Sequence, residues 1–445
     1  MRYSPPGLCL NDFELIKLGN QYHLIHLQGP PIHPFDATYL ESSYGHAVSD
    51  DLVSWETKAP VFGVASPKQF DDCGIWTMQI TPYENKLWMF YTGLSHQRYF
   101  YQQIGLAISE RQDGTSWIRF KPVPLVSADP RYYQVADDMA WRDPFVIYDP
   151  GENIWIMYIA AKTKNGNKKT RGCIGMATSA NLIDWAVKPP VISPSKYFEM
   201  ECPIIFKHNN FIYMFVSISD DRRVHTYRAS KPLGPFKYLG QLTPQNNYAA
   251  RIINTGNTLL LLHTVPRRWQ NEDSGDLMRG MLAQPKELIF DEKGYPYLGW
   301  YSALEEHFLP DESNSGKNGL LTVQLPPDYS EICIGLRLNQ KNSKKSGLEV
   351  LINRNELTLR YFEDKQKLES VKLEQETSFN EIKILLFGEY VEIYGDKKLF
   401  ISTLSYRHHT GNFEAYNNKK AIEFSFRSYN MKKNLIKRDD LNSLY

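Results

Sequence analysis

The sequence predicts an all-β protein, a five-bladed β-propeller followed by a C-terminal β-sandwich. Short aromatic strands recur in a fixed order along the first two thirds of the chain. Few windows show the 3.6-residue period of a helix, and the last third alternates apolar and polar residues instead. Aromatic residues make up 13% of the chain, which excludes a disordered protein and leaves a large core to be buried.

The repeated unit is an aromatic strand followed by a second strand that ends in a small-residue turn and then an aromatic landmark. Four such units end at Trp55, Trp117, Trp185 and Phe236, and a fifth begins near Thr258. Several strands per unit at this spacing indicate radial repetition of small antiparallel sheets. An array of ordinary sandwiches with accidental recurrence is the alternative, and it explains the repeated order of elements less well.

The composition along the chain predicts two domains. We expect the propeller over residues 1–306 and a polar Pro/Ser/Asn/Gly linker over 307–318. Alternating runs such as Leu348–Ile352 predict the sandwich over 319–430. The remaining residues, 431–445, form a charged C-terminal tail.

The charge balance excludes two classes of partner. The 51 Lys and Arg residues nearly cancel the 50 Asp and Glu residues, so a polyanion such as nucleic acid is not an expected partner. No apolar stretch approaches the ~20 residues that span a bilayer, so we expect no membrane partner. The N-terminal segment MRYSPPGLCL has no apolar core typical of a signal peptide, which predicts a cytoplasmic protein unless a signal peptide has been removed.

We expect no metal site. The five cysteines are widely spaced without a CxxC pair, which argues against a disulfide framework or structural zinc. The early histidines also fit no metal-ligand spacing. They are His23, His26, His33 and His46.

Three acidic residues stand just before the aromatic strands of different predicted blades. They are Asp12, Asp143 and Glu201. The innermost strand of each blade lines the central channel, so carboxylates at equivalent positions would converge at one mouth of it. Glycoside cleavage needs such a pair, one carboxylate to attack the sugar and the other to protonate the leaving oxygen. A third carboxylate can bind sugar hydroxyls, and Arg142 beside Asp143 can orient a neighbouring carboxylate.

These motifs resemble glycoside hydrolase family 32, the invertase, inulinase and levanase group. The resemblance extends over nearly the whole chain, and the order of Asn-Asp, Arg-Asp-Pro and Glu-Cys-Pro is its most specific part. The segments that carry it are Asn11-Asp12, Tyr44–Ser49, Asp51–Val53, Trp55, Phe90–Gly93, Arg142–Pro144, Glu201–Pro203, Gly347–Ile352 and Tyr390–Tyr394.

The resemblance implies a role for each carboxylate. Asp12 is the nucleophile, Glu201 is the acid/base, and Asp143 stabilises the transition state by binding ring hydroxyls. It further implies retention of configuration through a fructosyl-enzyme intermediate, with no metal and no organic cofactor. The expected ligand is a disaccharide or oligosaccharide substrate, and pairing through the sandwich domains would allow a homo-oligomer.

The expected sugar pocket departs from the family pattern. The segment Phe13–Leu15 replaces Pro-Asn-Gly, Leu27 stands where the family has Gln, and Ile75–Gln79 replaces the Phe-Ser-Gly-Ser segment. Changed hydrogen-bond partners alter substrate selectivity strongly. The residues expected to bind substrate are Asn11, Arg142, Trp76, Thr77, Gln28, Tyr44 and Cys202.

The sequence therefore predicts a retaining exo-glycosidase that releases terminal β-fructofuranosyl residues by double displacement from sucrose-like or fructan oligosaccharides. Two alternatives stay open. One is a hydrolase of another furanoside, either an arabinofuranoside or an unusual fructoside. The other is a non-catalytic carbohydrate-binding propeller.

Overall fold

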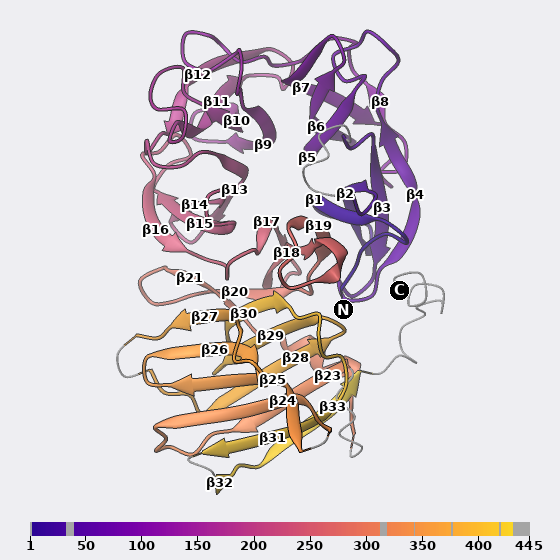
Figure 1. Ribbon diagram of the computed structural model, residues 1–445. Helices are drawn as coiled ribbons and strands as arrows, with labels where there is room; N and C mark the ends of the chain where they lie inside the picture. The colour runs from indigo at the N-terminus through magenta and orange to yellow at the C-terminus, as the bar shows by residue number, and fades with distance from the viewer. Residues whose placement is uncertain are drawn as a thin grey trace. The chain divides into compact units, whose positions relative to one another are not determined.

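The computed structural model describes residues 2–32, 40–311, 318–341, 343–374, 377–417 and 420–429. The described chain forms two compact units, one of residues 3–264 with 279–285, the other of residues 2, 265–278 and the described residues from 286 onward. Nearly all regular structure is β-strand (Figure 1), which confirms the all-β prediction. Among the described residues, no helix has the length and apolarity to cross a membrane.

The first unit repeats an antiparallel four-stranded meander. Each meander places consecutive strands side by side, and Figure 1 shows these sheets arranged about a common centre. The strands are β1 (Cys9–Leu18), β2 (Gln21–Gly29), β3 (Ser43–Ser49) and β4 (Glu56–Gly63); β5 (Gly74–Tyr83), β6 (Lys86–Ser95), β7 (Arg98–Ser109) and β8 (Ile118–Arg119); β9 (Trp141–Asp149), β10 (Ile154–Lys162), β11 (Gly172–Ser179) and β12 (Trp185–Ile192); and β13 (Met200–His208), β14 (Phe211–Ile218), β15 (Arg223–Ala229) and β16 (Lys237–Gln241).

Three further strands follow the fourth meander. They are β17 (Tyr248–Asn254), β18 (Leu259–Arg268) and β19 (Leu277–Leu282). Strand β17 pairs with β18, and β19 pairs with β1 through Leu10 and Gly280. The second strand of each meander is the most buried, as in β10, where Met157, Tyr158 and Ile159 are buried. Aromatic and β-branched side chains favour these positions because they pack well on a pleated surface.

The other unit contains two sheets that enclose one core. Side chains alternate along its strands, so Ile332, Ile334 and Leu336 of one sheet and Ile382 and Ile384 of the other join the same buried cluster. Its elements are η1 (Trp269–Asn271), β20 (Lys286–Phe290), β21 (Pro296–Gly299), η2 (Ser302–His307), β22 (Phe308–Pro310), β23 (Asn318–Gln324), β24 (Glu331–Lys341), β25 (Lys344–Asn353), β26 (Glu356–Tyr361), β27 (Lys367–Lys372), β28 (Glu381–Phe387), β29 (Tyr390–Gly395), β30 (Lys398–Leu404), β31 (Asn412–Asn417), β32 (Lys420–Ala421) and β33 (Phe424–Tyr429).

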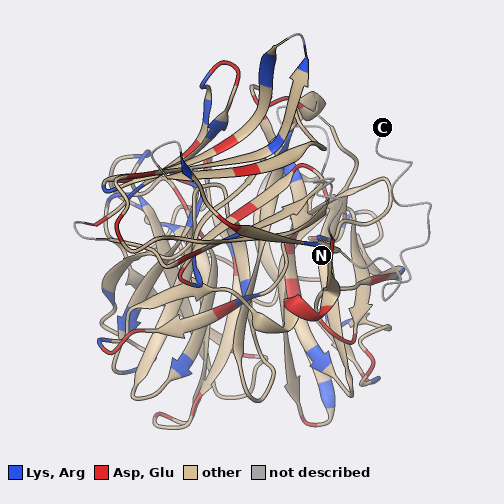
Figure 2. Cartoon of the chain, turned by 90° about the horizontal axis from the view of Figure 1, so that it is seen from below, with Lys and Arg blue, Asp and Glu red and all other residues tan. Residues whose placement is uncertain are grey.

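The limits predicted for the two domains stay predictions. The compact units separate within β18 and near residue 285, and the described part of the expected linker carries the short strand β22. Residues 312–317 of the expected linker and the expected tail, 431–445, lie outside the described residues. Acidic and basic residues are interspersed along the strands and loops (Figure 2), in line with the near-zero net charge.

Candidate active site

A backbone irregularity recurs in the first strand of each sheet of the propeller-like unit. In β1, β5, β9, β13 and β17 the register of pairing with the next strand shifts by one residue. Such bulges bend a strand and re-aim the side chains within them. The residues that the pairing skips are Asn11 and Asp12, Thr77, Asp143 and Pro144, Cys202 and Pro203, and Ala249 and Ala250.

Three of these bulges hold a non-glycine residue in the left-handed region. The backbone φ is 56° at Asp143, 46° at Cys202 and 46° at Ala249. A side chain in this region costs about 1–3 kcal/mol and persists only where surrounding structure compensates. The bulges are therefore built into the fold, and they present these side chains at matching places on neighbouring strands.

The bulges of β1, β5 and β9, together with Glu201 beside the β13 bulge, open onto a cavity of about 400 Å³. It brings together seven of the ten residues predicted for the site, including all three carboxylates. The residues that line it are Asn11, Asp12, Leu27, Glu41, Trp76, Thr77, Gln102, Arg142, Asp143, Glu199, Glu201 and Arg279.

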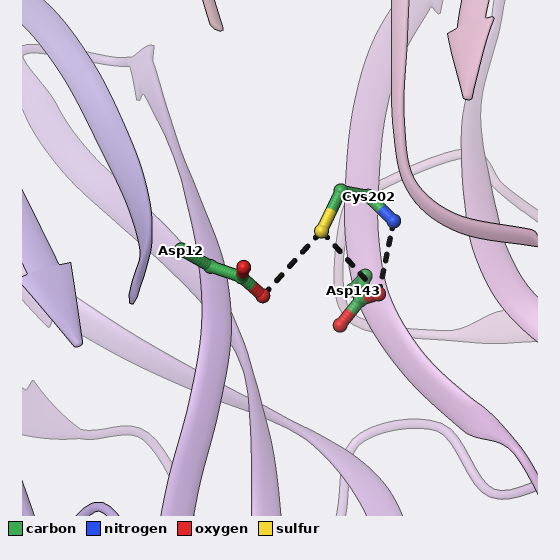
Figure 3. A group of neighbouring side chains, drawn as sticks. All are labelled: Asp12, Asp143 and Cys202. Carbon is green, nitrogen blue, oxygen red and sulfur yellow. Dashed lines mark hydrogen bonds between the residues drawn. The ribbon is translucent and has the colours of Figure 1, made fainter. Parts of the chain in front are cut away.

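Hydrogen-bond donors from two other strands, β5 and β13, hold the Asp12 carboxylate. The Thr77 hydroxyl donates to Asp12 Oδ2, and the Cys202 thiol lies 3.4 Å from the same oxygen. Figure 3 shows the Cys202 sulfur between Asp12 and Asp143, whose Oδ2 also accepts a 2.9 Å bond from the Cys202 backbone N–H. Burial and the nearby Asp143 charge raise the pKa of Asp12 to about 6, although the Thr77 and Cys202 donors lower it. Asp12 is therefore mostly ionised at neutral pH.

Glu201 faces a cation that it shares with another carboxylate. Arg142 Nη2 donates to Glu201 Oε1 and, at 2.6 Å, to Glu199 Oε2. Burial, with Glu199 and Asp143, raises the pKa of Glu201 to about 8 against the opposing effect of Arg142. Glu201 is therefore mostly protonated at neutral pH, while Asp12 is mostly ionised. Carboxyl groups whose pKa values are pushed apart in this way mark an acid and a nucleophile.

Similarity to known proteins identifies the family of the chain. A model of the glycosyl hydrolases family 32 N-terminal domain matches residues 3–276, more than half of the chain. The chain belongs to glycoside hydrolase family 32. Among curated proteins it is similar to a fructan 6-exohydrolase from Beta vulgaris, with 24% identity over 46% of this chain and 32% of that protein. It is also similar to a sucrose-6-phosphate hydrolase from Zymomonas mobilis, with 25% identity over 63% and 57% of the two chains.

The chain covers less than two thirds of the length of each of these curated relatives. Solved structures of family 32 match over more of their length. The fructan 1-exohydrolase IIa from Cichorium intybus gives a TM-score of 0.74 at 15% identity over 96% of both chains. A β-fructofuranosidase from Bombyx mori gives 0.69 at 16% identity over 96% of this chain and 93% of that one. At such identity the likeness concerns the fold, and it matches the propeller-plus-sandwich architecture of the family.

Three of the residues predicted to bind substrate do not line the cavity of this family 32 chain. Leu27 lines the cavity. Successive side chains of a strand point to opposite faces, so the neighbouring Gln28 points away from the cavity. The Gln28 amide donates to Ser43 Oγ at 3.2 Å. Tyr44 is fully buried, and its hydroxyl donates to the Trp76 carbonyl at 2.6 Å. Tyr44 thus supports the cavity wall from behind. Cys202 reaches the site through Asp12 and Asp143.

Besides Leu27, four lining residues were not predicted from the sequence to belong to the site. They are Glu41, Gln102, Glu199 and Arg279. Glu199 stands two residues before Glu201, and the alternation of an extended chain could have placed both on one face. For the others the sequence carries no comparable signal. Glu41 reaches the site by bonding the Trp76 indole N–H at 3.0 Å and Arg279 at 2.5 Å, contacts that only the tertiary fold creates.

The donor atoms of Asp12, Asp143 and Cys202 lie within 4.8 Å of one another. Burial and the two carboxylates raise the pKa of the Cys202 thiol well above its usual range, so the sulfur remains a hydrogen-bond donor. We interpret this cluster as a hydrogen-bonded group that holds the Asp12 carboxylate.

Of the early histidines, His23 Nδ1 and His46 Nε2 are 3.0 Å apart, and His33 lies outside the described residues.

Proposed function

We propose that this chain is a retaining exo-glycosidase that releases terminal β-fructofuranosyl residues from sucrose-like or fructan oligosaccharides. The observation that carries the proposal is the meeting of Asp12, Asp143 and Glu201 in one cavity, with Asp12 ionised and Glu201 protonated at neutral pH. The relatives named above act on fructans or on a phosphorylated sucrose, so a fructosyl group is the shared substrate element.

The proposed reaction proceeds by double displacement. The Asp12 carboxylate attacks the anomeric carbon while Glu201 gives its proton to the departing glycosidic oxygen, which breaks the bond and leaves the sugar covalently attached to Asp12. Glu201 then takes a proton from water, and the water oxygen displaces Asp12 from the sugar. Two inversions return the original configuration, and Asp143 holds the ring hydroxyls.

The charges around the cavity favour a neutral glycoside over a sugar phosphate. Among the described residues, the lining side chains include five carboxylic acids and two arginines. Each arginine is already paired, Arg142 with Glu199 and Glu201, and Arg279 with Glu41. A phosphate group would meet excess negative charge there, which disfavours its binding.

We also infer that the propeller has five blades. In the described chain the first strands of successive sheets contact one another in the order β1, β5, β9, β13 and β17, and β17 contacts β1. A closed ring of five inner strands accounts for all of these contacts.

The test is release of monosaccharide by the purified chain. Sucrose, 1-kestose, inulin, levan and sucrose 6-phosphate are incubated with it alongside arabinofuranosides, and NMR identifies the anomer released first. We expect β-fructofuranose from the neutral fructosides. We expect Asp12→Asn and Glu201→Gln each to lose at least about 100-fold in kcat/KM.

The matched control is Asp129→Asn, an acid-to-amide change at a carboxylate outside the cavity that pairs with Arg131. Near-full activity in either site variant would refute the assignment. Turnover of arabinofuranosides alone would change the substrate to another furanoside. Sugar binding without any turnover would identify a non-catalytic carbohydrate-binding propeller.

A further inference from the structure

Glu201 lies against a cation that should oppose its proposed role. A guanidinium beside a carboxyl group favours the ionised form and commonly lowers the pKa by about 1–3 units. A general acid, however, must carry a proton at the working pH. Arg142 donates directly to Glu201, and although burial opposes ionisation of Glu201, a second negative charge beside Arg142 would offset the arginine charge further.

Glu199 is placed to do this. Its Oε2 accepts from the same Arg142 nitrogen, Nη2, that donates to Glu201. Two oxygens bonded to one nitrogen lie within about 5 Å of each other, so the two carboxyl groups compete for one positive charge at close range. Glu199 precedes β13 and Glu201 lies at its start, so a short segment of backbone fixes both.

A second cation keeps Glu199 ionised. Its other oxygen, Oε1, lies 3.0 Å from Lys162 Nζ at the end of β10, where the lysine is buried. Lys162 pairs in turn with Asp138 at 2.6 Å, and Arg171 pairs with Asp138 at 3.2 Å. Although burial raises the pKa of Glu199, Arg142 and Lys162 lower it to about 2. Glu199 therefore carries its charge throughout the neutral range.

We propose that Glu199 is a positioning residue of the active site: by sharing Arg142 with Glu201, it keeps the Glu201 carboxyl protonated at neutral pH. This inference rests on the proposed role of Glu201 as the acid. Arg142 then orients the Glu201 side chain without forcing it to ionise. Glu199 acts on Glu201 through the shared Arg142 and through its own negative charge, and it has no proposed contact with the reacting atoms.

The other charged groups that face Glu201 do not replace Glu199. Asp143 on β9 acts in the same direction, and its charge remains when Glu199 is changed. Asp12 on β1 and Cys202 on β13 are occupied with each other and with Asp143. Without Glu199, Arg142 would retain only Glu201 and Asp143 as carboxylate partners among the described residues.

The experiment compares the wild-type chain with Glu199→Gln, which keeps the shape and removes the charge. The Glu201 carboxyl is titrated by ¹³C NMR on protein labelled at the Glu side-chain carboxyl carbons, and its signal is assigned by its loss in Glu201→Gln. We expect the Glu201 titration midpoint to fall by about one pH unit or more. The alkaline limb of kcat/KM on the best fructoside should fall by the same amount.

Three further variants complete the design. Glu199→Met removes the same charge with a side chain of similar volume, and it should reproduce the shift if the Gln variant is unstable. Glu199→Asp keeps the charge and should restore most of the wild-type midpoint. Glu41→Gln removes a cavity carboxylate that bonds Trp76 and not Arg142. It should leave the titration midpoint of Glu201 unchanged.

A Glu201 midpoint that does not move in folded Glu199→Gln or Glu199→Met would overturn the inference, as would an equal shift in Glu41→Gln. The NMR titration needs no turnover. If the wild-type chain hydrolyses no glycoside, the proposed function fails, while the coupling of Glu199 to Glu201 is still measured on its own.

Discussion

Replacing Thr77 by valine tests whether Asp12 is the group that must be ionised. The Thr77 hydroxyl donates to Asp12 Oδ2, and the Thr77 side chain is buried in β5. Valine has nearly the same shape and cannot donate. The substitution therefore removes one hydrogen bond to the charged form of Asp12 and leaves the cavity wall filled.

The size of the effect follows from that one bond. A hydrogen bond to a charged group contributes about 1.5–3 kcal/mol, and each pKa unit corresponds to about 1.36 kcal/mol. The wild-type pKa of Asp12 is about 6. Loss of the Thr77 hydrogen bond should therefore raise the pKa of Asp12 to about 7–8. The ionised fraction at pH 6 then drops from about one half to between a tenth and a hundredth, so kcat/KM falls about 5- to 50-fold. At pH 8 the loss is about two-fold or less.

The assay is the pH dependence of kcat/KM on the fructoside that the chain hydrolyses best. Thr81→Val is the matched control, since Thr81 lies on the same strand and donates to Gln79 at 3.0 Å. We expect its acid limb to coincide with that of the wild type. An acid limb that stays near pH 6 in folded Thr77→Val would refute the assignment of that limb to Asp12.

Further predictions concern the site and the sandwich unit. The wild-type profile should be bell-shaped, with activity lost below about pH 6 as Asp12 takes up a proton and above about pH 8 as Glu201 loses one. Trp76→Phe removes the indole N–H that bonds a wall carboxylate at 3.0 Å, so KM should rise about five-fold with kcat little changed. Lys286→Met leaves the fully buried Glu392 without its 2.6 Å cation and should reduce the free energy of unfolding by about 3–5 kcal/mol in urea titrations. The double variant Lys286→Met/Glu392→Leu should recover much of the lost free energy of unfolding. If it recovers none, the unpaired Glu392 charge is not the cause of the destabilisation.

Much of the fold could be predicted from local patterns. Repetition of aromatic strands and period-2 alternation are properties of neighbouring residues, and each strand reports its own buried face. The three carboxylates could also be predicted from the sequence, because each precedes an aromatic strand of the repeated unit. The three carboxylates meet at one cavity because each lies in or beside the bulge of its strand, although the register puts them at three different positions relative to those bulges.

The substrate wall was less accessible to sequence reasoning, because it depends on register. A shift of one residue moves a side chain to the opposite face of a strand. Gln28 was expected to bind substrate, but Leu27 is the residue that lines the cavity. Glu41 and Arg279 meet only because segments more than two hundred residues apart become neighbours, with their charged atoms 2.5 Å apart. No local pattern encodes that contact.

The repeated bulges explain how a symmetric scaffold holds an asymmetric site. In the four bulges that skip two residues, the first skipped position is held by Asn11, Asp143, Cys202 or Ala249, and Asp12 is the second skipped residue of β1. The backbone thus provides position, and residue identity provides chemistry. The Thr77 hydroxyl of β5 and the Cys202 thiol of β13 stabilise the charge of Asp12 from two different inner strands. The Ala249 side chain in the β17 bulge can neither donate nor ionise, so among the five bulges only those of the other four strands present donor or acidic side chains.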